Sequence, residues 1–253
     1  MNIYNIIFSP TGGTARAAAL LAGGFSSEAI AVDLCCPEWK SVLPALSADD
    51  LCIISVPSFG GRVPEAAAQR LMQLSGCGAM AVPVAVYGNR AYEDTLIEMK
   101  DILTGCGFRC IAAVAAIAEH SMLRQYAAGR PDENDARELA DFGRRIMASI
   151  QTGSVSDDLQ VPGNIPYRQI GAFLKPETTD ACRRCGLCAA KCPAGAIPAD
   201  NPGTTDPGAC ISCVRCVSIC PAKARRLNPD VLEAVNGRIG PALSGYKRNE
   251  LFL

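Results

Sequence analysis

Two cysteine runs of identical spacing constrain this chain more than any other feature of its sequence. Each run reads Cys-x2-Cys-x2-Cys-x3-Cys-Pro, and together they hold eight of the 14 cysteines. The first run comprises Cys182, Cys185, Cys188 and Cys192, and the second comprises Cys210, Cys213, Cys216 and Cys220. Bacterial iron–sulfur proteins use this spacing, and the fourth cysteine of each run ligates the cluster of the other run. The sequence therefore predicts two [4Fe–4S] clusters, one on Cys182, Cys185, Cys188 and Cys220, the other on Cys210, Cys213, Cys216 and Cys192.

Zinc sites and disulfides are the alternatives for so many cysteines. Zinc sites usually combine two closely spaced ligands with two distant ones, so two identical four-cysteine runs disfavour zinc. Disulfides compensate for a missing core in small secreted domains, whereas this chain has 253 residues and is 49% hydrophobic. The first residues lack the basic start, apolar stretch and cleavage site of a secretory signal. We therefore expect a cytoplasmic protein whose thiols stay reduced.

The charge and hydropathy of the chain exclude several other classes. With 24 basic and 25 acidic residues, the chain has no overall field that would attract nucleic acid or an anionic membrane. The longest clean apolar run, Ile111 to Ala118, is far shorter than the roughly 20 residues that cross a bilayer. The composition is also unlike that of collagen, a coiled coil or a disordered tail. We expect no binding to nucleic acid or membrane, and the oligomeric state is left open.

Short apolar runs alternate with helix-like stretches up to about residue 150. The predicted strands cover residues 3–8, 29–34, 51–56, 82–87 and 111–117, and the predicted helices cover 15–21, 65–74, 92–103 and 134–150. This alternation favours βαβ units around a parallel sheet that is buried on both faces. Because proline cannot donate to a central strand ladder, we expect the fourth strand to begin at or after Pro83.

The composition changes near residue 150 and divides the chain into four parts. Residues 1–150 form the predicted α/β domain, and residues 151–172, rich in glycine and proline, form a connector laid over it. Residues 173–228 carry the cysteine runs. Residues 229–253 are amphipathic, and we expect them to dock on the body of the protein.

Three predicted loops follow strands of the first domain and share glycine and polar residues. The loop at residues 9–14, Ser-Pro-Thr-Gly-Gly-Thr, leads from a strand into a helix and can present amides and hydroxyls to a phosphate. It lacks the lysine of the ATP-binding P-loop and the Gly-x-Gly-x-x-Gly of dinucleotide folds. The loops at 57–62 and 87–92 add aromatic residues that suit a flat, hydrogen-bonding ring. Ligands bind at the carboxyl ends of such strands, although solvated connections have similar composition.

The motifs at Ser9 to Thr14 and at Tyr87 to Asp94, Tyr-Gly-Asn-Arg-x-Tyr-x-Asp, resemble those of flavodoxin. Residues 1 to about 228 resemble the flavodoxin–ferredoxin fusion proteins of anaerobic bacteria. The resemblance implies a flavodoxin-like doubly wound five-stranded parallel sheet of order 2-1-3-4-5, followed by a small α+β bacterial ferredoxin-like two-cluster domain. It also implies an FMN cofactor, although Gly13 stands where the family usually has asparagine.

The resemblance assigns two sets of residues to FMN. The phosphate set is Ser9, Thr11, Gly12, Gly13 and Thr14. The ring set is Pro57, Ser58, Phe59, Gly60, Gly61, Tyr87, Gly88, Asn89, Arg90 and Tyr92. His120 follows the fifth predicted strand, so it either lies at the flavin end or is a hydrogen-bonded structural residue.

Three functions are compatible with this sequence. The first is an electron-transfer protein that passes electrons between FMN and the two clusters. The second is a flavin-dependent reductase of a small substrate, with Tyr92 and His120 as candidate catalytic residues and Phe59, Arg62 and Arg90 as further substrate contacts. The third is a cluster protein whose first domain is a flavin-free docking scaffold, an alternative that the departure in the phosphate loop raises.

The cysteine-bearing region is locally basic. Between residues 171 and 228 there are eight Lys or Arg residues against four acidic ones. These cations either offset the negative charge of thiolate-ligated clusters or form a docking face for an acidic redox protein. We expect a redox protein as partner, and the sequence does not say whether it donates or accepts electrons.

Overall fold

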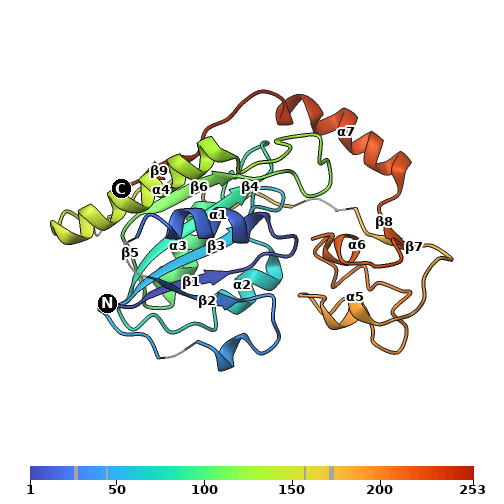
Figure 1. The fold of residues 1–253 in the computed structure, drawn as a ribbon, viewed down its shortest axis with the longest axis horizontal. Helices are drawn as coiled ribbons and strands as arrows, with labels where there is room; N and C mark the ends of the chain where they lie inside the picture. Colours follow the sequence, from blue (N-terminus) through green and yellow to red (C-terminus); the bar gives the residue numbers. More distant parts are fainter. Residues whose placement is uncertain (26–27, 44, 157, 171–173) are drawn as a thin grey trace.

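The computed structural model describes residues 1–253 apart from 26–27, 44, 157 and 171–173, and its first part is a doubly wound α/β domain. The main sheet has the strand order β2-β1-β3-β4-β6-β9, with β5 beside β4 and with β9 (Glu250–Phe252) at one edge (Figure 1). Its parallel strands are β1 (Ile3–Ile7), β2 (Ala29–Asp33), β3 (Leu51–Pro57), β4 (Met80–Tyr87), β5 (Arg109–Cys110) and β6 (Ala113–Ile117). Since β5 and β6 share the fifth position, the parallel order is 2-1-3-4-5. The predicted flavodoxin-like fold class is confirmed.

Helices cover both faces of this sheet. Helices α1 (Gly13–Ala22) and α4 (Glu133–Gln151) pack together with one set of alternating strand residues, including Ile3 and Ile53. Helices α2 (Glu65–Leu71) and α3 (Thr95–Gly105) pack with the other set, including Ile6 and Ile54. A 3-10 turn at Trp39–Ser41 buries Trp39 in the second of these cores. Two apolar cores, one on each face, hold the carboxyl ends of the strands at a fixed edge.

The start of the fourth strand differs from its prediction. Pro83 lies inside β4 and pairs with Ile54 of β3. On the other side, β4 pairs with β5 only at Met80 and Ala81, and with β6 only from Val84 onward. The missing N–H of Pro83 therefore falls at the interruption between β5 and β6, where no ladder hydrogen bond is lost. The expectation that the strand begins at or after Pro83 was wrong for this reason.

The cysteine-bearing unit is built from short elements. Strands β7 (Glu177–Thr178) and β8 (Arg225–Arg226) pair antiparallel, and between them lie helices α5 (Leu187–Ala190) and α6 (Arg215–Ser218). Each helix follows a left-handed residue, Gly186 or Val214. The unit lies beside the doubly wound domain, at the right in Figure 1. The expected boundary at residues 172 and 173 lies outside the described residues.

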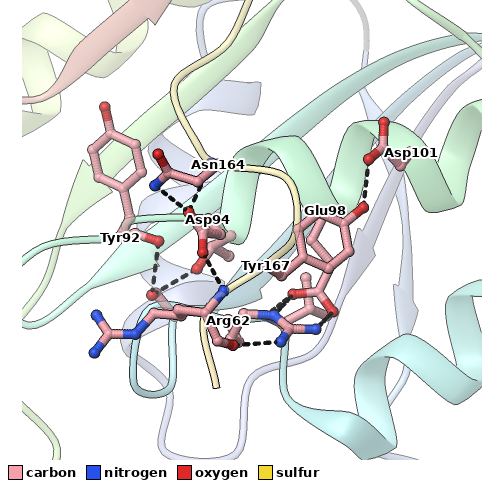
Figure 2. A network of polar contacts seen from close by, with 11 residues as sticks. Arg62, Tyr92, Asp94, Glu98, Asp101, Asn164 and Tyr167 are labelled. Carbon is pink, nitrogen blue, oxygen red and sulfur yellow. Dashed lines mark hydrogen bonds and ion pairs between the residues drawn. The ribbon is translucent and has the colours of Figure 1, made fainter. Parts of the chain in front are cut away.

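The connector is fastened to the first domain by a polar network (Figure 2). Asp94 accepts hydrogen bonds from the backbone N–H of Asn164 (2.9 Å) and of Arg168 (2.7 Å). Arg62 forms a two-pronged ion pair with Glu98 (2.7 and 2.8 Å) and donates to the carbonyl of Arg168 (2.8 Å). The ring of Tyr167 stacks 4.8 Å from the Arg62 guanidinium. Bidentate and charge-assisted bonds of this kind hold the connector at a defined place on the domain.

The last residues return to the first domain. Helix α7 (Pro229–Leu243) is capped by the Asn228 side chain, and β9 (Glu250–Phe252) pairs antiparallel with β6. Figure 1 shows α7 and the following segment passing back over the doubly wound domain. The antiparallel β9 is an addition to the five parallel positions that the sequence predicts. Among the described residues, no helix combines the length and the apolar character that crossing a membrane requires.

Candidate functional site

A cavity of about 410 Å³ lies at the carboxyl ends of the parallel strands. This volume falls within the roughly 300–1,000 Å³ typical of small-molecule and cofactor sites. The edge is the topological switch point of the sheet, where open α/β folds bind ligands. The wall from the first domain includes eleven of the predicted residues, namely Thr11, Gly13, Thr14, Pro57, Ser58, Phe59, Gly60, Tyr87, Gly88, Arg90 and His120. The three predicted loops and His120 thus meet at one cavity.

The loop before α1 forms the first part of the wall. Gly12 has a left-handed conformation (φ 95°), and an added Cβ there would meet nothing within 4 Å. The first amides of a helix have no intrahelical partner, so this loop and the start of α1 can receive an anion. Thr14 is buried, Thr11 is exposed, and both line the cavity. The loop therefore has the form of a phosphate site, with two hydroxyls beside the first amides of the helix.

The loop after β3 is a tight turn. Phe59 and Arg62 exchange backbone hydrogen bonds (3.0 and 3.2 Å), and Gly60 and Gly61 both have positive φ between them. Two left-handed residues in a two-residue turn define the type I′ geometry that glycine serves best. The turn brings Phe59 and Gly60 to the cavity. The Ser58 hydroxyl also lies there, 2.7 Å from that of Thr95.

His120 lies against the loop after β4. A Cβ on Gly88 would come within 2.8 Å of the His120 ring, so only glycine lets the two loops approach this closely. The Nδ1 atom of His120 accepts backbone hydrogen bonds from Met122 (3.3 Å) and Leu123 (3.1 Å). Burial, with a smaller contribution from Arg90, lowers the pKa of His120 to about 4. The ring is therefore neutral near pH 7 and carries its proton on Nε2.

Five predicted contacts lie elsewhere than in the cavity wall: Ser9, Gly12, Gly61, Asn89 and Tyr92. The Ser9 hydroxyl accepts from the amide of Ala15 (3.0 Å), which fixes the start of α1. Asn89 donates to the carbonyls of Leu243 (2.6 Å) and Gly245 (2.8 Å), and Tyr92 donates to Glu250 (3.2 Å). Asn89 and Tyr92 thus fasten the returning carboxyl-terminal segment. Arg62, a further suggested contact, is engaged with Glu98 and the connector.

The rest of the cavity wall comes from beyond residue 150. Helix α7 contributes Val235, Arg238 and Ile239, the connector contributes Arg168 to Ile170, and the cysteine-bearing unit contributes Ile211 and Ser212. The α7 residues have helical spacing, a pattern that identifies a face but not the surface it covers. The sequence predicts that the connector lies over the first domain and that residues 229–253 dock on the body, but it does not predict that these segments line the cavity.

The eight cysteines of the two runs surround two smaller cavities, four to each. Cys182, Cys185, Cys188 and Cys220 line one, and Cys192, Cys210, Cys213 and Cys216 line the other. This is the exchange of fourth cysteines that the spacing predicts. Among the described residues, no group of three or more Cys, His, Asp or Glu side chains could hold a single metal ion such as zinc. The donor set of each cavity, four thiols from two segments, fits a cluster with four irons at its corners.

The pKa values of these thiols are shifted in different directions. Burial raises the pKa of Cys213 to about 12 and that of Cys216 to about 11. For Cys220 burial is outweighed by backbone hydrogen bonds, including that from Ala224 (3.3 Å), so its pKa is lowered. Because the thiolate is the iron ligand, cluster assembly must release protons from Cys213 and Cys216. The Arg225 guanidinium, only 3% exposed, lines the first cysteine cavity and favours the anionic form of Cys216.

The second cysteine cavity is joined to the doubly wound domain. Arg70 of α2 donates to the carbonyl of Pro193 (2.7 Å), next to Cys192, and also to the carbonyl of Leu34. Ala194 and Ile211 pack against the apolar core on the α2 side of the sheet. The second quartet is therefore held between the cavity at the strand ends and the first quartet.

Comparisons with known proteins agree with this division of the chain. Residues 181–225 match the family model of the 4Fe-4S dicluster domain. No curated protein gives a significant match. Similar solved structures include a flavodoxin of Streptococcus pneumoniae TIGR4 (15% identity, TM-score 0.41) and flavodoxin 1 of Bacillus cereus (13%, 0.38). A short-chain flavodoxin associated with a PDU bacterial microcompartment is a third (13%, 0.42).

Each of these flavodoxins is covered over 98–99% of its length, against 58–59% of this chain. Their TM-scores are low, so the fold assignment rests on the strand order and on the matched dicluster domain. The chain joins a flavodoxin-like domain to a 4Fe-4S dicluster domain, the arrangement of flavodoxin–ferredoxin fusion proteins.

Proposed function

We propose that this protein is an electron carrier that holds FMN in the cavity at the strand ends and two [4Fe–4S] clusters on the two cysteine quartets. The proposal is supported above all by a residue that lines two of the cavities. Ile211, from the loop of the second quartet, lines both the large cavity and the cavity of that quartet. The two cavities therefore share a wall residue, which supports a short path between the flavin site and the nearer cluster site.

FMN exchanges two electrons or one, whereas each cluster exchanges one, so this set of cofactors converts between two-electron and one-electron chemistry. The chain's own residues hold and orient these groups. Amides of the 11–14 loop and the Thr11 and Thr14 hydroxyls bind the phosphate. Phe59 and the Gly88 loop lie along the ring, and α7 and the connector exclude water from it.

The order of the two cluster sites follows from their positions. The second quartet is beside the flavin cavity, and Cys188 of the first quartet is close enough to Cys216 to raise its pKa. Cys185 is exposed and is flanked by exposed Arg183 and Arg184. Electrons therefore pass between the flavin and the outside through the second quartet and then the first. The two arginines and nearby exposed Lys223 face an acidic redox protein.

The reductase alternative has less support in the geometry. Of its suggested contacts, Arg62 and Tyr92 are occupied by Glu98 and Glu250, outside the cavity. The cavity is also covered by the connector, by α7 and by the loop of the second quartet. The volume of the cavity, about 410 Å³, is within the range of sites that hold a single cofactor or ligand. His120 remains available there as a neutral hydrogen-bond donor.

The test is the cofactor content of protein purified without oxygen. We expect about eight iron, about eight sulfide and one FMN per chain, with the absorbance of both flavin and clusters. Eight iron without FMN, even after incubation with free FMN, would favour the flavin-free scaffold. An FMN that is oxidised rapidly by a small organic substrate, with no redox protein present, would favour the reductase.

A further inference from the structure

Arg225 is a buried cation beside the first cysteine quartet. The residue is 3% exposed and lies in the wall of the first cysteine cavity. Its guanidinium donates to the hydroxyl of Thr205 (2.5 Å) and to the carbonyls of Pro202 (2.5 Å) and Thr204 (2.8 Å). The carbonyl of Pro202 also accepts from the thiol of Cys188 (3.6 Å). A single oxygen therefore lies between the guanidinium and a sulfur of the first quartet.

The positive charge of Arg225 has no counter-charge in the protein. All three of its hydrogen-bond partners are neutral, and no carboxylate of the described residues forms an ion pair with it. The other buried guanidinium, that of Arg130, is paired with Asp135. A buried charge is costly unless it is paired, and an arginine cannot lose its proton. A thiolate-ligated cluster on the first quartet, which carries net negative charge, supplies the missing partner.

The second quartet has an apolar residue at the corresponding place. Arg225 and Ile197 each lie five residues after the last cysteine of their run, Cys220 and Cys192. Ile197 is 5% exposed and lines the second cysteine cavity, as Arg225 lines the first. Two equivalent buried positions therefore place a cation beside one cluster site and an alkyl side chain beside the other.

The other arginines of the two walls are closer to solvent. Arg183 and Arg184 of the first cavity are exposed, and Arg215 of the second is half-buried. Water and salt screen such charges more than a buried one, so Arg225 exerts the strongest field of the four. Its charge also reaches Cys216 of the second quartet. Within the described chain, however, Arg225 lines the first cavity and not the second.

We propose that Arg225 raises the reduction potential of the first-quartet cluster above that of the second-quartet cluster. A cluster becomes more negative when it accepts an electron, and a nearby buried cation favours that state. This rests on the proposed function and gives it a direction. One electron leaves the second-quartet cluster, which is oxidised, and reduces the first-quartet cluster, while Arg225 keeps its proton. The electron thus comes to rest at the exposed quartet, where a partner can take it.

The order of the two potentials is tested by reductive titration of anaerobic, cluster-loaded protein, followed by low-temperature electron paramagnetic resonance. In the wild type the first electron should appear on the first-quartet cluster. The signal of the half-reduced protein should then be missing in Cys185→Ala, which lacks a ligand of that cluster. The same half-reduced signal in both proteins would place the first electron on the second quartet and overturn the inference.

The role of Arg225 itself is tested by substitution. Arg225→Ile copies the residue of the second quartet, and Arg225→Lys keeps the charge. In Arg225→Ile the equilibrium constant for reduction of the first-quartet cluster should fall about tenfold or more, a downward shift of about 59 mV or more. The second-quartet cluster should shift less, and Arg225→Lys should retain most of the wild-type potential. Arg226→Ile is the matched control, because this next residue is exposed and the change removes the same charge. It should leave both potentials unchanged.

Iron content shows whether each variant holds both clusters. If Arg225→Ile assembled none, the order of the potentials in the wild type and the potential of Arg225→Lys would still decide. An equal shift in Arg226→Ile would overturn the inference, since net charge would then suffice. A fall in Arg225→Lys as large as in Arg225→Ile would also overturn it, since the charge would not be the cause. Either result leaves the proposed function intact, whereas a wild-type protein that assembles no iron–sulfur cluster would overturn the proposed function itself.

Discussion

The two cysteine quartets have the same spacing and nearly the same backbone, yet they lie in different surroundings. Three pairs of residues separated by 28 positions share positive φ, namely Arg184 and Ser212, Gly186 and Val214, and Gly195 and Lys223. Cys185 of the first quartet is exposed, whereas its counterpart Cys213 is 8% exposed. The second quartet also contacts the doubly wound domain through Arg70 and Ile211.

This difference shows how one repeated motif can serve two tasks. The repeated backbone sets where four thiols converge, and it is the same in both halves. The residues between the cysteines differ in their surroundings: Arg183 and Arg184 of the first quartet are exposed, whereas Ile211 and Ser212 of the second line the large cavity. We therefore interpret the second quartet as the inner site and the first as the outer site.

Removal of one cysteine from each quartet gives the largest expected effect. Cys213→Ala should abolish one-electron exchange between FMN and any external partner, because it breaks the inner site. Cys185→Ala should damage the outer cluster and still permit electron exchange between FMN and the inner one. Low-temperature electron paramagnetic resonance of the reduced protein would distinguish the remaining cluster in each variant. If both substitutions changed electron exchange with FMN equally, the distinction between an inner and an outer site would be wrong.

Charge reversal at the outer quartet should change only electron exchange with the external redox partner, and not electron exchange within the protein. The double variant Arg183→Glu and Arg184→Glu should lower the second-order rate of electron exchange with an acidic redox protein by about tenfold or more at low salt. The wild-type rate should fall as ionic strength rises. Arg144→Glu with Arg145→Glu, on exposed positions of α4, is the matched control. An equal loss in the control would show that net charge, rather than this face, directs the partner.

Arg70→Ala should loosen the inner quartet. The substitution leaves the carbonyls of Pro193 and Leu34 without this donor, at a cost of about 1–3 kcal/mol. Amide hydrogen exchange at residues 194–197 should become faster, and electron exchange between FMN and the inner cluster should become slower. Arg144→Ala, which removes an exposed pair with Asp141, should change neither. If neither hydrogen exchange nor electron exchange changed in Arg70→Ala, other contacts would hold the cysteine-bearing unit in place.

The pH response of His120 tests the environment of the cavity. Because the pKa of His120 is lowered to about 4, from 6.5 in the unfolded chain, the unfolded state binds the extra proton between these values. Stability contributed by neutral His120 is present above pH 6.5 and is lost as the pH falls towards 4. Since His120 is the single histidine, ¹⁵N resonances of labelled histidine report it directly. They should show the neutral Nε2–H form at pH 6, and a titration near pH 6.5 would contradict this assignment.

The smallest expected effect comes from a substitution that tests the left-handed backbone conformation shared by the two quartets. Gly186 has φ 76°, and an added Cβ would meet no protein atom within 4 Å, so Gly186→Ala adds a backbone cost without a clash with the protein. We expect a loss of about 1–2 kcal/mol in the apparent stability of the outer cluster against denaturant. Gly237→Ala, inside α7 and equally uncrowded, should instead gain about 0.5–1 kcal/mol. A gain in Gly186→Ala would show that the left-handed conformation is not required there.

Spacing and periodicity predict much of this architecture because both are local properties of the chain. The cysteine runs predict the two quartets, and the alternation of strands and helices predicts a parallel sheet. The strand order, and with it the edge where the cavity lies, follows from the resemblance to flavodoxin. Loop composition is less specific, since Asn89 and Tyr92 suit a ring contact yet bond the returning carboxyl-terminal segment. That segment, the connector and Ser212 reach the cavity through contacts distant in sequence. Their local patterns predict that the connector and the last residues lie on the first domain, but not which of their residues reach the cavity.

The central claim is that electrons move between FMN and the inner cluster within one chain. It is tested most directly by flash photoreduction of anaerobic protein with a one-electron reductant, following cluster and FMN absorbance over time. We predict a phase in which the clusters reoxidise as FMN is reduced, at a rate independent of protein concentration, present in the wild type and absent in Cys213→Ala. A rate proportional to protein concentration, or an unchanged phase in Cys213→Ala, would contradict the account.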